Sequence, residues 1–127
     1  MKKTAVRLIA IASCAAAVAV AQAPAIKRMI LQRTDVTPDR EAVLGLAEIS
    51  AGGSTGRHTH PGIETGYVLE GTTVLAIDGE APRTLKAGDS YSIPAGRVHD
   101  ARAEGGTARV LATYVVEKGK PLASPAK

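Results

Sequence analysis

Aromatic residues and cysteine are scarce in this chain of 127 residues. It contains no Trp, no Phe, three Tyr and a single Cys. Without large rings, Val, Ile, Leu and Ala have to fill any hydrophobic core. One cysteine excludes an intrachain disulfide, so covalent cross-links contribute nothing to stability. The length excludes more than one ordinary domain.

Acidic residues are absent from residues 1–21. This stretch is basic up to Arg7, apolar from Leu8 to Val20, and carries small residues at Ala19 and Ala21. That order is typical of a secretory signal peptide that is cleaved after its last small residue. The apolar run is too short to span a bilayer. We therefore expect export to the periplasm or the extracellular space, with no stable membrane insertion after signal removal.

A second interpretation of the same stretch concerns its only cysteine. The residues before Cys14 read Ile11-Ala12-Ser13, which resembles the lipobox of bacterial lipoproteins. Only six apolar or small residues, Leu8 to Ser13, would precede the lipidated cysteine. We favour removal of Cys14 with the signal and keep a lipoprotein anchored at Cys14 as the alternative.

Charge is nearly balanced in the remainder of the chain. Of the 16 basic residues, 13 follow position 21, and all 12 acidic residues also follow it. The signs are mixed and no basic cluster alternates with aromatic residues, which excludes the usual nucleic-acid surface. The expected partner is a small molecule and not a nucleic acid.

Short apolar segments recur between turn residues. They are rich in β-branched residues and are bounded by Gly, Pro and Asp, as strands are. The expected strands cover residues 26–32, 42–49, 67–69, 74–77, 91–93 and 110–116. So many short strands in a small chain predict an all-β fold closed into a barrel or sandwich.

The expected domain organisation has three parts. They are a signal peptide at 1–21, a β-barrel domain at 22–117 and a C-terminal tail at 118–127 that contains Pro121 and Pro125. A domain of this size without large aromatic residues has a marginal core. We therefore expect a homodimer that buries more surface by pairing the Ile26–Gln32 strand with a partner's sheet edge.

The spacing of the three histidines indicates that their side chains lie close together. His58 and His60 are two residues apart, so on a strand both side chains point to the same face. Glu64 follows after a Pro-Gly bend, and His99 comes from a later turn. Three imidazoles and one carboxylate form a good ligand set for a divalent transition metal. Asp100 follows His99 directly and should point the other way, in a structural role.

These residues resemble the two sequence motifs of the cupin superfamily. The matching positions are Gly52, His58, His60, Glu64 and Gly71 in the first motif and Gly88, Pro94, Gly96 and His99 in the second. The final Asn of the second motif is replaced by Ala103. The resemblance is to small single-domain bacterial cupins of the quercetin-dioxygenase-like type. It implies a jelly-roll β-barrel that holds one divalent metal per chain, Fe, Mn, Ni, Cu or Zn, through His58, His60, Glu64 and His99.

The resemblance also implies a function. We expect an exported metal-dependent enzyme that acts on a small organic molecule chelated at the metal, either dioxygenase-like or isomerase-like. Glu64 could double as the catalytic base. The alternative is a non-catalytic module that binds metal or a small ligand. A second polar group beside the metal would favour catalysis, and an apolar lining would favour binding alone.

Other polar side chains near the motifs have simpler interpretations. Tyr67 and Tyr91 are expected as core filler. Arg57, Arg97 and Arg102 flank the ligands and could bind a carboxylate substrate. The first two could instead form a salt bridge with the glutamate of the motif.

Overall fold

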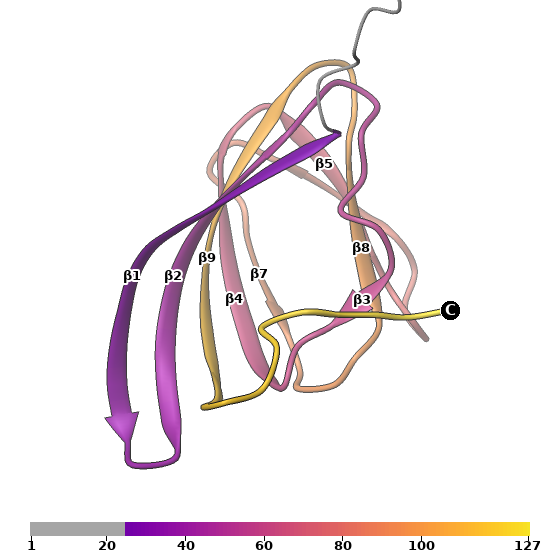
Figure 1. The fold of residues 1–127 in the computed structure, drawn as a ribbon. Coiled ribbons are helices and arrows are strands. Elements are labelled where there is room, and N and C mark those ends of the chain that lie inside the picture. The colour runs from indigo at the N-terminus through magenta and orange to yellow at the C-terminus, as the bar shows by residue number, and fades with distance from the viewer. Residues whose placement is uncertain (1–24) are drawn as a thin grey trace, which may run out of the picture.

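The computed structural model describes residues 25–127, which form ten strands (Figure 1). The predicted signal peptide lies outside the described residues. The strands are β1 (Ile26–Thr37), β2 (Arg40–Ile49), β3 (His58–Thr59), β4 (Gly62–Glu70), β5 (Thr72–Ile77), β6 (Arg83–Lys86), β7 (Ser90–Ile93), β8 (His99–Ala103), β9 (Ala108–Glu117) and β10 (Ser124–Pro125). Within the described part, the structure contains no helix of the length and hydrophobicity that a membrane crossing requires.

The strands form two antiparallel sheets of five strands that face each other. One sheet has the order β1-β2-β9-β4-β7 and the other β10-β3-β8-β5-β6. The chain crosses between the sheets repeatedly, as in a jelly roll (Figure 1). This confirms the predicted all-β fold. The apolar segments of the sequence did not indicate β6, β8 and β10, because these strands are short or polar.

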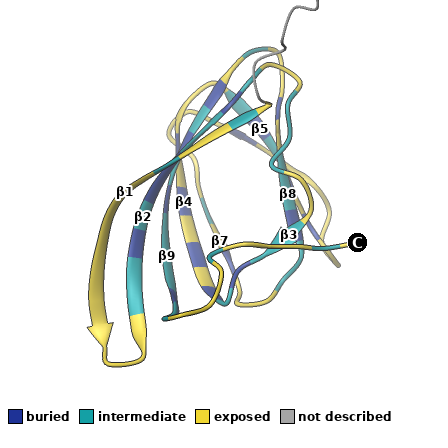
Figure 2. Ribbon diagram, viewed as in Figure 1, coloured by how far each residue is buried: buried dark blue, intermediate teal, exposed yellow. Residues whose placement is uncertain are grey.

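Alternation along β4 defines the inside of the barrel. Glu64, Gly66 and Val68 are buried, whereas Thr65 and Tyr67 between them are exposed. Aliphatic residues from both sheets pack together further along the same strands, as Figure 2 shows by burial. This core cluster consists of Val68, Leu75, Ile77, Leu85, Ile93 and Val110. Aliphatic side chains therefore fill the core, as the composition required.

The motif glycines lie at turns that require a positive φ. Gly71 joins β4 to β5 at φ 75°, and a Cβ there would lie 2.4 Å from the Thr107 carbonyl oxygen. Gly88 has φ 97° in the turn before β7. Residues with a side chain rarely adopt this backbone conformation, so glycine is needed at both positions. The two turns hold the strands that carry the motif residues in register.

Residues 118–127 form a segment that we name the C-terminal strap. After β9 the strap crosses the end of the barrel at which β3 lies (Figure 1). Its β10 pairs with β3, with Ser124 opposite Thr59 and Pro125 opposite His58. The Ala126 amide donates to the Arg57 carbonyl oxygen at 3.0 Å. Two of the residues expected as a tail, Ser124 and Pro125, are thus part of the second sheet.

The first two strands form a long hairpin at the edge of the other sheet. Strand β1 pairs only with β2, so its outer edge has no neighbour among the described strands. Along this hairpin β1 is largely exposed (Figure 2), including Leu31 at 53% and Val36 at 55%.

Candidate metal site

The three histidines meet at the end of the barrel that the C-terminal strap crosses. His58 on β3 pairs directly with His99 on β8, and their ring centroids are 4.2 Å apart. His60 follows β3, and its ring centroid lies 4.8 Å from that of His58. One nitrogen from each ring lies within 4.8 Å of the others. The convergence expected from the His-x-His spacing is present, together with the third ring.

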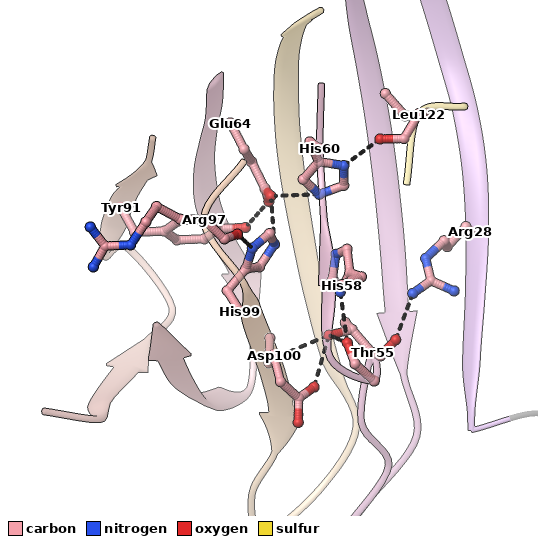
Figure 3. Close-up of polar contacts among 12 residues, drawn as sticks. Arg28, Thr55, His58, His60, Glu64, Tyr91, Arg97, His99, Asp100 and Leu122 are labelled. Carbon is pink, nitrogen blue, oxygen red and sulfur yellow. Dashed lines mark hydrogen bonds and ion pairs between the residues drawn. The ribbon is translucent and has the colours of Figure 1, made fainter. Parts of the chain in front are cut away.

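Glu64 enters the same cluster from the facing sheet. Its side chain is buried, with 5% of the residue exposed. Oε2 lies 3.0 Å from Nε2 of His60 and 3.2 Å from Nε2 of His99 (Figure 3). The structure therefore brings together all four residues that the sequence pattern singled out. Arg57 and Arg97, the other partners considered for Glu64, form no ion pair with it.

Each imidazole is oriented by a main-chain carbonyl. A carbonyl oxygen only accepts, so each Nδ1 donates, and in the neutral ring Nε2 keeps its lone pair for a ligand. The hydrogen bonds run from His58 to Gly56 at 2.6 Å, from His60 to Leu122 at 2.6 Å and from His99 to Arg97 at 2.9 Å. Such contacts fix the tautomer and ring orientation of metal-binding histidines.

The inward atoms of this cluster have no hydrogen-bond partner among the described residues. They are Nε2 of His60, Nε2 of His99 and Oε2 of Glu64, all fully buried. Oε2 lies 3.0 and 3.2 Å from the two nitrogens, but with each imidazole proton on Nδ1 neither Nε2 has a hydrogen to donate to it. Nitrogen lone pairs facing a carboxylate repel unless a cation or proton lies between them, and burial makes the arrangement costly. The donor set fits a single divalent metal ion.

Tyr91 holds the second oxygen of Glu64. Its hydroxyl donates to Oε1 at 2.7 Å (Figure 3). The ring packs over Gly66, its cross-strand partner, where a Cβ would lie 2.1 Å from the ring. Tyr91 is therefore core filler, as expected, and also a partner of the candidate ligand. The expectation for Tyr67 was wrong, because it lies on the outer face of β4 and is 47% exposed.

Burial and neighbouring groups set the pKa values in this cluster. Burial raises the pKa of Glu64, but the two adjacent imidazoles and the Tyr91 hydroxyl outweigh it and bring the pKa to about 2. Burial lowers the pKa of His58. Burial also acts against the charged form of His99, yet the carboxylate of Glu64 leaves its pKa raised. The carboxylate is thus held ionised beside the rings.

The cluster opens into a cavity of about 80 Å³ between the sheets. Most of its wall is aliphatic, and Leu122 and Ala123 of the C-terminal strap form part of it.

Tyr114 on β9 also lines the cavity and pairs directly with Glu64 on β4. Its ring centroid is 4.6 Å from that of His60. Between positions 25 and 127, no group forms a hydrogen bond with the Tyr114 hydroxyl. Burial and the charge of Glu64 raise the pKa of Tyr114, and the charge of Arg28 lowers it.

The arginines expected near the site lie elsewhere. Arg57 forms a bidentate ion pair with the carboxylate of Asp78, and Arg97 donates to the Asp78 main-chain carbonyl oxygen. Neither these two nor Arg102 lines the cavity. The arginine that lines it is Arg28 on β1. Sequence reasoning missed Arg28 and Tyr114, although each occupies an inward position of a predicted strand.

Asp100 secures the loop before β3. Its Oδ1 accepts from the hydroxyls of Ser54 at 2.6 Å and Thr55 at 2.9 Å. The Thr55 hydroxyl in turn accepts from the Ala101 amide at 2.9 Å. This supports the structural role expected for Asp100, which positions the loop that delivers His58 (Figure 3).

Comparisons with known proteins agree with this architecture. The family model described as "Cupin domain" matches residues 45–116. The polyketide cyclase RemF from Streptomyces resistomycificus is similar at 29% identity and a TM-score of 0.63, over 82% of this chain and 75% of that one. KdgF from Halomonas sp. is 26% identical with a TM-score of 0.61, over 73% and 82% of the two chains.

A third solved structure shares the fold at lower identity. A cupin superfamily protein from Desulfitobacterium hafniense is 20% identical with a TM-score of 0.62, over 72% of this chain and 77% of that one. No curated protein matches the sequence.

Proposed function

The chain belongs to the cupin family, and from this premise we propose that it is a metal-dependent enzyme that acts on a small organic molecule. One divalent transition metal, Fe, Mn, Ni, Cu or Zn, would be held by His58, His60, Glu64 and His99. The observation that carries the proposal is the set of buried, unpartnered Nε2 and Oε2 atoms that face one another. Nothing else in the described structure satisfies these atoms.

The chain's own residues divide the work around such a metal. A bound divalent metal would polarise a substrate oxygen as a Lewis acid. Three main-chain carbonyls orient the imidazoles, and Tyr91 fixes the carboxylate of Glu64. The aliphatic walls of the cavity exclude water from the substrate. A pKa of about 2 suits Glu64 as a ligand; its further role as a base stays a prediction.

Polar groups beside the cluster support turnover over binding alone. Tyr114 pairs with Glu64 across the sheet and presents a hydroxyl that no described residue uses. Such a hydroxyl is protonated at neutral pH and can donate a proton to a substrate. A module that only binds metal has no need of it. We assign Tyr114 as the proton donor in the cavity.

The reaction class that these residues support best is proton transfer, as in an isomerase or cyclase. The likeness to a protein described as a polyketide cyclase agrees with this class. Dioxygenase-like oxygen insertion is the second candidate, since a set of three His and one Glu resembles that of such enzymes. The two classes differ in whether oxygen is consumed.

A paired screen tests the proposal and separates the two reaction classes. Metal-loaded protein would be incubated in D₂O with flavonols, diketones, catechols and small oxo acids, while deuterium incorporation and oxygen uptake are both followed. We expect deuterium incorporation, reduced about 100-fold or more by Tyr114→Phe. Tyr67→Phe, on the outer face, is the matched control and should leave the rate unchanged. Oxygen uptake without deuterium incorporation would favour the dioxygenase. The absence of both deuterium incorporation and oxygen uptake with every metal would contradict an enzyme of either class.

We also propose that the protein is exported. The support is the order of basic, apolar and small residues in positions 1–21. Mass spectrometry of the protein from the native periplasm or medium should give an N-terminus at Gln22. A lipid-modified N-terminus at Cys14 would establish the lipoprotein alternative, and an intact cytoplasmic chain would contradict export.

A further inference from the structure

Arg28 lies on the same face of its sheet as the candidate carboxylate ligand. In the strand register, Arg28 is opposite Ala47, Ala47 is opposite Val110, and Val110 is opposite Val68. Val68 and Glu64 are both buried inward positions of β4. Because side chains opposite one another across a sheet share a face, Arg28 projects to the cavity side of the sheet, where it lines the cavity and is also exposed to solvent. In Figure 3 it lies across His58 from Glu64.

Within the described part of the chain, the positive charge of Arg28 has no ion-pair partner. One nitrogen, Nη2, donates to the Thr55 carbonyl oxygen at 2.9 Å. Among residues 25–127, no carboxylate forms an ion pair with this guanidinium, as is also the case for Arg40, Arg83 and Arg102, none of which lines the cavity. Of the described Lys and Arg residues, Arg28 alone lies in the wall of the cavity. The remaining donors of its guanidinium are available to an anion.

Tyr114 supplies a second free donor in the same cavity. Its hydroxyl has no partner within the described part of the chain, and its ring packs over the backbone of Gly45, 3.5 Å from a Cβ placed there. Gly45 lies two residues from Ala47, the cross-strand partner of Arg28. Arg28 can therefore pair with the charged end of a small anion, while the Tyr114 hydroxyl, which lies nearer Glu64, can donate to an oxygen at its other end.

We propose that the cavity binds a small organic carboxylate, with Arg28 as the counter-charge of the carboxylate and Tyr114 as the donor nearer the metal ligands. This inference rests on the proposed function, because a hydroxyl or oxo oxygen at the other end of the molecule would face the metal ligands. The cavity of about 80 Å³ restricts the ligand to a few carbons. Arg28 is thus a specificity-determining residue that selects anionic over neutral substrates.

The test compares levulinate with its neutral methyl ester, which differ in charge but share the oxo group. Both probes would be titrated calorimetrically into metal-free and metal-loaded protein. We expect wild type to prefer levulinate by at least about tenfold, because a charge-assisted pair forms only with the carboxylate. Arg28→Gln should abolish the preference and Arg28→Lys should keep part of it. Arg102→Gln, on an arginine outside the cavity, should match wild type.

The outcomes separate this inference from the proposed function. Equal affinity for the two probes in wild type, or an undiminished preference in Arg28→Gln, would overturn the carboxylate site. A protein that binds no metal would instead contradict the proposed function, while the metal-free titrations still decide the role of Arg28. Thermal unfolding of each variant checks that the barrel is intact.

Discussion

The main-chain oxygen of Leu122 accepts a hydrogen bond from Nδ1 of His60 at 2.6 Å, across 62 residues of sequence. Adjacent residues of the C-terminal strap pair with β3, the strand that leads into His60. Arg57 donates to the main-chain oxygen of Lys127 and secures the end of the strap. The strap is therefore both a wall of the cavity and an orienting group for one candidate ligand.

Removal of the strap should weaken metal binding. A chain that ends at Lys118 loses the carbonyl that orients His60, and loss of such a partner costs about 10- to 100-fold in metal affinity. Competition with a chromogenic chelator measures this affinity. Leu122→Ala keeps the main-chain oxygen, so it is the matched control and should stay near the wild-type value. Unchanged affinity in the truncated chain would show that the strap has no part in the site.

The strap illustrates what the sequence could and could not predict. His58, His60, Glu64 and His99 were predictable because the His-x-His spacing places two rings on one face and two short motifs resemble those of cupins, which implies the full set. Leu122 contributes its main-chain carbonyl oxygen. Because every residue has one, the residue type at position 122 gave no signal of this contact. Arg28 and Tyr114 come from strands far apart in the chain. Their inward direction depends on cross-strand register, and one position of error reverses it.

Gly66→Ala should disturb both the core and the candidate ligand. The new Cβ would lie 2.1 Å from the ring of Tyr91, which cannot move without leaving Glu64. Overpacking of this kind costs about 1 to 3 kcal/mol in the free energy of unfolding. Urea denaturation measures the loss. Gly106→Ala is the control, since nothing lies within 4 Å of its Cβ and its φ is not positive. Equal stability of the two variants would contradict this packing.

Tyr91→Phe isolates the hydroxyl from the ring. The variant keeps the core packing but leaves Oε1 of the buried Glu64 without its 2.7 Å donor. An unsatisfied buried acceptor costs about 1 to 3 kcal/mol, so we expect the metal-free protein to lose that much stability at pH 7. Chemical denaturation tests this. Tyr67→Phe removes an exposed hydroxyl and should leave the free energy of unfolding unchanged. An unchanged free energy of unfolding in Tyr91→Phe would contradict a stabilising hydrogen bond from Tyr91 to Glu64.

Dimerisation stays a prediction. Strand β1 is an edge strand with exposed Leu31 and Val36, and an unpaired edge with apolar side chains favours association with a second copy. Light scattering at micromolar concentrations should give the mass of a dimer, and Leu31→Glu should shift it to a monomer. Leu69→Glu, on the outer face of β4, is the comparison variant. A monomeric wild type at every concentration would count against the dimer.

The central claim is that His58, His60, Glu64 and His99 hold one divalent transition metal. Elemental analysis of the protein purified from its native compartment tests it most directly. We predict about one Fe, Mn, Ni, Cu or Zn per chain in wild type and a strong reduction in His99→Ala, which removes one of the four donors. A wild-type protein that folds, remains intact and carries no such metal would contradict the account.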